Sequence, residues 1–307
     1  MHFGLRWHTV RDVQLRYLRK ERRVSCKGVT AIGIDEVMVG RTASGGQRYL
    51  TIVRNLHSGE VLWVGDGKGR DALNGFEKRL RRDRADIRII TMDLGHASAS
   101  WARENLPGAT VVHDHFHVIK LMNEGLDRVR RKTMAGLEGE ERKELKGQRH
   151  LFLRNEEEMA RTALEHLESI KAIAGDLGVM HTMKEDLRAS STACDSIQAK
   201  QLLNGWIASA RACAIDVMAR MADTVERRLE GIAAFWDGRL SNSHRSWFNS
   251  KLRGLLKLAN GYRNDEFFKL KIYDLPDQKI IDLTSPPPPK LAEMKRQSVW
   301  HSTSYQF

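Results

Sequence analysis

The stretch VTAIGIDEVMV, residues 29–39, decides how the first half of the chain folds. Its β-branched and apolar residues predict a buried strand, and an acidic pair, Asp35 and Glu36, lies inside it. Two similar runs follow after short turns that contain glycine, QRYLTIVRN at 47–55 and EVLWVGD at 60–66. Because short turns favour antiparallel pairing, the three runs predict an antiparallel meander.

Helical and strand-like segments alternate after this meander. The hydrophobic spacing predicts helices near 70–82, 97–105 and 116–132, and buried strands at IRIITMD (87–93) and ATVVHD (109–114). The resulting order is β-β-β-α-β-α-β-α. With right-handed crossovers, it predicts a mixed α/β sheet with helices on both faces, the order of ribonuclease-H-like folds.

The second half of the chain predicts helices only. No strand candidate occurs from 133 to 236, and the apolar stripe of 202–236 is typical of a helical core rather than of a cofactor site. We therefore expect five parts: a basic N-terminal region (1–27), the first part of the sheet domain (28–132), a large helical insertion (133–238), a closing helical part of the sheet domain (239–275), and a tail with four successive prolines (276–307) that is extended or disordered.

The N-terminal stretch FGLRWHTVRDVQLRYLRKERR, residues 3–23, predicts one basic amphipathic helix. Two interpretations fit it equally well. It resembles the second helix of a helix-turn-helix, in which case Arg6 and Arg11 would contact DNA, although no preceding helix is present to complete the motif. Alternatively, it is an amphipathic helix that docks on the rest of the chain.

Composition narrows the class of partner. The chain has 307 residues, with 51 Lys and Arg against 39 Asp and Glu, so its net charge is +12. This charge favours an anionic partner, most often nucleic acid, over a basic protein that is merely soluble. The three cysteines form no CxxC pair and indicate a reducing compartment without a zinc or disulfide framework. Neither a membrane-spanning run nor a signal peptide is recognisable, so we expect a cytoplasmic protein with no membrane partner.

Two aspartates are candidate metal ligands. Asp35 lies among apolar residues inside the first strand, where an ionised carboxylate needs a counter-charge or a metal. Asp93 ends the fourth strand at the carboxyl edge, where open sheets place ligands, although before Gly95 it could also be a turn or cap residue. Carboxylates suit Mg²⁺, and two such ions can clamp a phosphodiester during cleavage. Strand alternation turns Glu36 to the opposite face, outside this site.

A histidine-rich segment, VVHDHFHVIK (111–120), spans the end of the fifth strand. The alternation of His113, His115 and His117 could indicate a metal site, but no other clustered ligands accompany it. A supporting role is favoured, in which Asp114 caps the next helix and, with His117, lies behind the metal ligands.

Four segments of the chain resemble a known family. GIDEV (33–37), TMDLG (91–95), VVHDHFHVIKLMNEGLDRVRR (111–131) and SNSHRSWFNSKLRGLLKLANGYRNDEFF (241–268) are similar to the DDE transposases of the bacterial ISL-three insertion-sequence family. The resemblance runs from about residue 2 to residue 275. It implies a ribonuclease-H-like catalytic core with a helical insertion. It also implies an N-terminal zinc-binding and helix-turn-helix region, of which only the last helix would remain in this chain.

The resemblance also implies an activity. Members of this family cut and join DNA at transposon ends with two Mg²⁺ or Mn²⁺ ions, which two aspartates and one glutamate hold. DNA would be the partner, both as terminal repeats and as target, and at least a homodimer would hold the two ends. Such a protein would be associated with the nucleoid.

One family residue is missing. The first aspartate corresponds to Asp35 and the second to Asp93, while the glutamate position, flanked by Asn242 and Asn249, holds Ser246. A neutral serine hydroxyl is a poor Mg²⁺ ligand beside carboxylates. We therefore expect this chain to cleave DNA poorly or not at all.

The helix predicted from residue 242 to residue 257 is basic. We expect Trp247 in the core rather than stacked on DNA. Two alternatives to a transposase stay open, namely a DNA-binding protein without catalysis, such as a transposition repressor or a decayed remnant, and, more remotely, a nuclease of the same fold. The residues of this helix expected to contact DNA are Arg245, Asn249, Lys251, Arg253 and Lys257.

Overall fold

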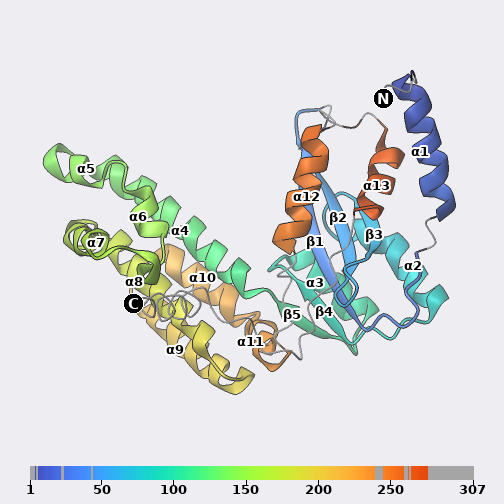
Figure 1. Ribbon diagram of the computed structural model, residues 1–307. Helices are drawn as coiled ribbons and strands as arrows, with labels where there is room; N and C mark the ends of the chain where they lie inside the picture. Colours follow the sequence, from blue (N-terminus) through green and yellow to red (C-terminus); the bar gives the residue numbers. More distant parts are fainter. Residues whose placement is uncertain are drawn as a thin grey trace, which may run out of the picture.

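A computed structural model describes residues 4, 6–21, 24–42, 44–238, 245–258, 262 and 264–275 (Figure 1). The expected proline-containing tail, 276–307, lies outside these residues.

The central sheet has five strands in the order β3-β2-β1-β4-β5. The first three strands pair antiparallel, whereas β4 is parallel to β1 and β5 is parallel to β4. The predicted meander and the predicted ribonuclease-H-like order are confirmed by this topology. The strands are β1 (Ala31–Arg41), β2 (Gln47–Asn55), β3 (Val61–Asp66), β4 (Ile89–Met92) and β5 (Thr110–His113).

Helices cover both faces of the sheet, as predicted. One face packs on α2 (Asn74–Asp83), which follows the 3₁₀ turn η1 (Asp71–Leu73), and on α3 (His96–Asn105). The other face packs on α12 (Arg245–Leu258) and α13 (Asp265–Tyr273) through four buried side chains. The α12 and α13 helices therefore close the sheet domain although β5 ends at His113 and α12 begins only at Arg245. Their packing residues are Phe248, Leu252, Phe268 and Ile272.

The N-terminal helix is shorter than predicted. It is α1 (Trp7–Glu21), and the described residues Gly4 and Arg6 before it are not helical. Figure 1 shows α1 beside α13, where Arg19 forms a bidentate ion pair with Glu266. Leu18 is the buried apolar residue of α1. These contacts agree with a docked helix and leave the helix-turn-helix interpretation a prediction.

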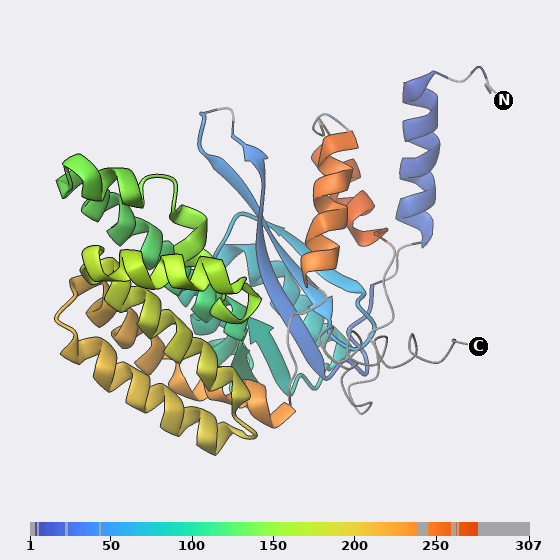
Figure 2. The same ribbon diagram turned by 60° about the vertical axis from the view of Figure 1, so that its left-hand side comes forward.

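Residues 115–238 form a separate group of helices with its own hydrophobic core. Figure 2 shows this group lying to one side of the sheet. No strand occurs from residue 115 to residue 238, and the predicted stripe residues Trp206, Ile207 and Ala210 are buried. The helix α4, which follows β5, packs into this group. The helices are α4 (His115–Gly136), α5 (Gly139–Leu145), α6 (Arg149–Leu153), α7 (Arg161–Ile173), α8 (Asp176–Ala189), α9 (Ser196–Ala212), α10 (Asp216–Glu226) and α11 (Leu229–Gly238), with 3₁₀ turns η2 (Glu156–Glu158) and η3 (Ser190–Thr192).

Candidate active site

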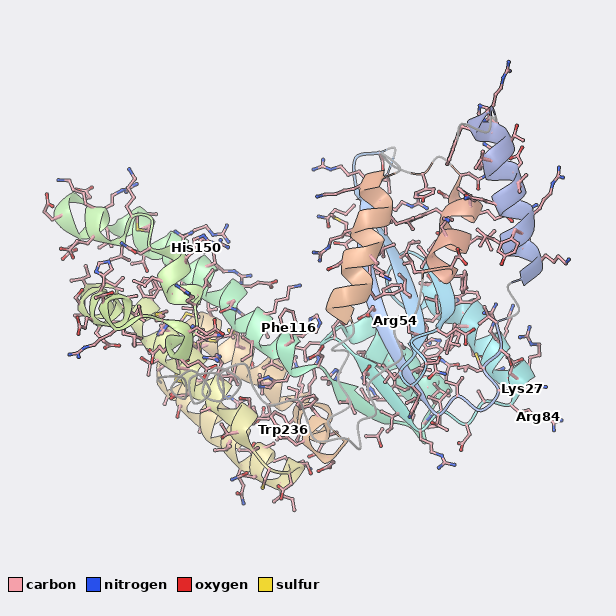
Figure 3. The ribbon with its side chains drawn as sticks, in the orientation of Figure 1. Lys27, Arg54, Arg84, Phe116, His150 and Trp236 are labelled. Atoms are coloured by element: carbon pink, nitrogen blue, oxygen red, sulfur yellow. The ribbon has the colours of Figure 1, made fainter. Side chains whose placement is uncertain are left out.

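Asp35 is buried in β1 and paired with an arginine. Its carboxylate oxygen Oδ2 lies 3.2 Å from Nη2 of Arg54 on β2, and the two side chains are 1% and 5% exposed. The Arg54 guanidinium also lies over the ring of Phe248 on α12, 4.8 Å from its centroid. Figure 3 shows Arg54 on the sheet beside α12. The expected counter-charge of Asp35 is therefore supplied, at least in part, by Arg54.

The sequence pattern could have indicated Arg54, although our sequence analysis missed it. Leu50, Ile52 and Arg54 alternate along β2, so they share one face, and Leu50 and Ile52 belong to the core under α12. In the strand register, Ile52 is opposite Asp35 and Arg54 is opposite Gly33. A guanidinium at an inward position needs a nearby anion, and the acid of the neighbouring strand provides it.

Asp93 directly follows β4, the strand next to β1. The β1–β4 register ends with Ile34 opposite Met92, so Asp35 and Asp93 occupy the next positions of two adjacent parallel strands. The Oδ1 atom of Asp93 accepts a hydrogen bond from the backbone N–H of Gly95 at 2.9 Å. Asp93 therefore makes the turn contact that was the alternative interpretation, and its role as a metal ligand stays a prediction.

Glu36 lies on the other face of β1, as alternation predicted. The hydroxyl of Ser98 on α3 donates to its Oε1 at 3.3 Å. Burial raises the pKa of Glu36 above its ordinary value, and the negative charge of Asp93 raises it further. Glu36 is thus close enough to Asp93 for their charges to interact, which strand alternation alone did not indicate.

The three alternating histidines point to different neighbours. His113 makes a 3.0 Å hydrogen bond between its ring Nδ1 and the backbone oxygen of Asp93, while His115 packs edge-on against Trp236 of α11. Burial lowers the pKa of His115 to about 4, so this imidazole is neutral at pH 7. His117 is buried, with the ring of Phe116 edge-on to its own at 5.7 Å. Figure 3 shows Phe116 on α4 and Trp236 on α11.

Asp114 caps α4, as predicted. Its side chain accepts a hydrogen bond from the backbone N–H of Phe116 at 3.0 Å, and its backbone is extended, as a cap requires. A role for Asp114 and His117 behind metal ligands stays a prediction.

The described residues bring no three carboxylates together as a metal site. Among the side chains that the structure describes, no group of three or more His, Cys, Asp or Glu residues is arranged to hold a metal ion. Position 246 lies at the start of α12, two residues before Phe248, which packs on the sheet beside Arg54. The side chain at this position, Ser246, lies outside the description. Asp35 faces a guanidinium, a cation that would repel a metal ion.

The predicted DNA contacts are only partly described. On α12, Arg253 and Lys257 are exposed and Lys251 is half-buried. Near the N-terminus, Arg6 is exposed before α1, and Arg11 is paired with Asp12 at 2.7 Å. The side chains outside the description on this helix are those of Arg245, Trp247 and Asn249.

A cleft that the sequence did not indicate opens between the sheet domain and the helical group. Its volume is about 1020 Å³, and α3, β5, α9, the α10–α11 turn and α11 line it. Three arginines lie in its wall, Arg103 on α3 and Arg227 and Arg228 in the turn between α10 and α11. No sequence signal could have found them together, because residues 103 and 227 meet only through the packing of α11 on β5.

No helix among the described residues is both long and apolar enough to cross a membrane.

Comparison with known proteins supplies the family. The chain is 28% identical over 275 residues to the "Transposase for insertion sequence element IS1001" of Bordetella parapertussis, with 88% of this chain and 67% of that protein covered. It is 29% identical over 286 residues to the "Transposase for insertion sequence element IS1557" of Mycobacterium tuberculosis (strain CDC 1551 / Oshkosh), with 85% and 63% covered. The chain therefore spans about two thirds of the length of these relatives.

A solved structure, the "Drosophila P element transposase strand transfer complex", overlaps with a TM-score of 0.42 at 12% identity, covering 85% of this chain and 79% of that one. The strand order, rather than this overlap, defines the fold. A family model described as Transposase, that of the ISL-three DDE transposases, matches residues 32–272, from the start of β1 to the end of α13. The chain belongs to the ISL-three family of insertion-sequence DDE transposases.

Proposed function

We propose that this chain is an insertion-sequence transposase by descent that binds DNA but, as written, cleaves and joins it poorly or not at all. The observation that carries the proposal is the buried ion pair of Arg54 and Asp35. It lies under α12, the helix on which Ser246 occupies the glutamate position of the family.

Simple electrostatics supports impaired metal binding. In an active member, Asp35, Asp93 and a glutamate at position 246 would hold two Mg²⁺ or Mn²⁺ ions, with Asp114 and His117 behind them. Here one position is neutral, and a guanidinium already lies against one remaining carboxylate. Divalent ions in proteins favour clustered carboxylates, so both features lower the affinity for metal. DNA cleavage therefore cannot follow the usual metal-dependent route at a useful rate.

DNA binding requires neither a bound metal ion nor a glutamate at position 246. Phosphate contacts depend on positive side chains. We assign them on α12 to Arg245, Lys251, Arg253 and Lys257 with Asn249, and near the N-terminus to Arg6 and Arg11. The partners would be the terminal repeats and target DNA, bound by a homodimer or larger assembly in the nucleoid.

The test is a cleavage and strand-transfer assay on the cognate transposon ends with Mg²⁺ or Mn²⁺. The wild-type chain should give little or no product, and Ser246→Glu combined with Arg54→Val should give more. The matched control is Ser246→Gln with Arg54→Val, which has the same size but no charge and should stay inactive. Robust cleavage by the wild-type chain would overturn the proposal.

A second candidate is a DNA-binding protein without catalysis, such as a repressor of a full-length transposase. The serine at position 246 favours it, because repression by occupancy needs no metal ligand. Asp93→Asn separates the two candidates. DNA retention should persist in this variant under both, whereas any residual metal-dependent cutting should disappear only if the chain is an enzyme.

A further inference from the structure

The cleft between α3 and the α10–α11 turn has three arginines in its wall. We call Arg103, Arg227 and Arg228 the arginine cluster. Arg103 and Arg227 are exposed, and Arg228 is half-buried. They come from two parts of the molecule, because α3 covers the sheet, whereas the α10–α11 turn belongs to the helical group.

The arginine cluster has no carboxylate partners within the described part of the chain. None of its three guanidiniums forms an ion pair there, and the only side-chain hydrogen bond of Arg228 is a 3.5 Å contact with the backbone oxygen of Thr224. The acids that line the cleft have partners other than the arginine cluster. Glu226 is held by Arg211 and Glu230 by Lys200. A third acid, Asp237, accepts a hydrogen bond from the backbone of Ser196.

The arginine cluster is also close to Asp93, at the carboxyl edge of the sheet. Burial lowers the pKa of Arg228, and the charges of Arg227 and Arg103 lower it further, whereas the carboxylate of Asp93 opposes this effect. These four groups are therefore near enough to interact electrostatically. His113, which also lines the cleft, bonds to the backbone of Asp93 and connects the two places.

Holding like charges together is unfavourable in the free protein, unless an anion binds between them. We propose that the arginine cluster binds backbone phosphates of a DNA strand that runs through the cleft toward Asp93. This inference rests on the proposed function in taking DNA as the ligand. A cleft of about 1020 Å³ is far larger than a single phosphate ion, and its apolar wall of Ala99, Val111 and Ala234 suits sugar rings between phosphates.

The test uses fluorescence anisotropy with the full chain and a short labelled duplex over a series of salt concentrations. Arg103→Gln and Arg228→Gln should each weaken binding by roughly tenfold. Each should also reduce the slope of log K against log salt by about 0.9, the value for one lost phosphate contact on duplex DNA. A labelled single strand should show the same order of variants with a smaller slope change, about 0.7.

Arg84→Gln is the matched control. Arg84 is exposed, forms no ion pair in the described part of the chain, and lies in Figure 3 at the end of the sheet domain away from the helical group. Removing its charge changes the net charge as much as the cleft variants do. It should leave affinity and salt slope at the wild-type values.

Two outcomes would overturn the inference. The first is an equal loss for Arg84→Gln, because net charge alone would then explain binding. The second is wild-type affinity for both cleft variants. If the wild-type chain binds no DNA at all, the proposed function itself fails. Arg103 is exposed, so Arg103→Gln decides the matter even if Arg228→Gln unfolds.

Discussion

At the residue scale, breaking the pair of Asp35 and Arg54 should affect stability and metal binding in opposite directions. Each side chain is buried, and the Nε atom of Arg54 already has no hydrogen-bond partner. Asp35→Leu would leave the guanidinium buried without this anion. We expect it to lower the free energy of unfolding by about 3 kcal/mol. Urea unfolding of the purified chain measures this change.

The double variant Asp35→Leu with Arg54→Leu provides the control for that prediction. It removes both charges, and apolar replacement of a buried ion pair is often neutral or stabilising. We therefore expect it to regain most of the stability lost by the single variant. If the double variant is no more stable than Asp35→Leu, the loss comes from packing rather than from an unpaired charge.

The sequence predicted the roles of some single residues and not of others. The burial of Asp35 and the capping role of Asp114 followed from strand and helix patterns, and both are confirmed. The partner Arg54 was not predicted, although its alternation with Leu50 and Ile52 indicates an inward position on β2. The proximity of Glu36 to Asp93 was not readable, because alternation gives the face of a side chain but not its distance from the end of a neighbouring strand.

At the element scale, the packing of α11 on β5 positions the wall of the cleft. Gly231 of α11 makes this close approach possible, since a Cβ atom there would lie 2.7 Å from Cδ2 of His113 and 3.1 Å from the backbone oxygen of Val111. The His113 ring cannot move freely because it is hydrogen-bonded to Asp93. We expect Gly231→Ala to lower the free energy of unfolding by about 1–3 kcal/mol. Thermal and urea unfolding measure the effect.

A second helical glycine gives the contrast. A Cβ atom at Gly205 in α9 would meet nothing within 4 Å. Gly205→Ala should therefore stabilise the chain by up to about 1 kcal/mol through helix propensity alone. If the two alanine variants had the same sign, helix propensity rather than the contact with β5 would govern Gly231.

Elements were predictable where their own pattern carried the signal. The five strands and the helices α2, α3 and α4 lie within a few residues of their predicted bounds because each buries one periodic face. The helix-only character of the insertion also followed from its period. The packing of α11 on β5, and with it the cleft, did not follow, because contacts between segments distant in sequence depend on tertiary packing.

At the scale of the whole molecule, the helical group and the sheet domain have separate cores. We therefore expect acid to destabilise one of them before the other. His181 lies fully buried in the helical group, with its Nε2 atom 3.4 Å from the ammonium nitrogen of Lys184. Burial lowers its pKa from 6.5 to about 4, and the charges of Lys184 and Lys171 act in the same direction. The folded chain therefore keeps this imidazole neutral at pH values where the unfolded chain protonates it.

Because folding lowers the pKa of His181, the free energy of unfolding should fall as the pH is lowered. A histidine whose pKa is depressed by folding contributes its full stability above pH 6.5 and loses it as the pH falls toward about 4. The loss for His181 should approach about 3 kcal/mol. Hydrogen exchange, corrected for the intrinsic pH dependence of each amide, should show protection falling in α8 and α9 while β1 and β2 remain protected. His181→Leu should reduce this dependence, whereas the part that His115 contributes should remain. An equal fall in the sheet and in the helices would mean that the two cores unfold as one unit. An unchanged fall in the leucine variant would mean that acid does not act through this buried imidazole.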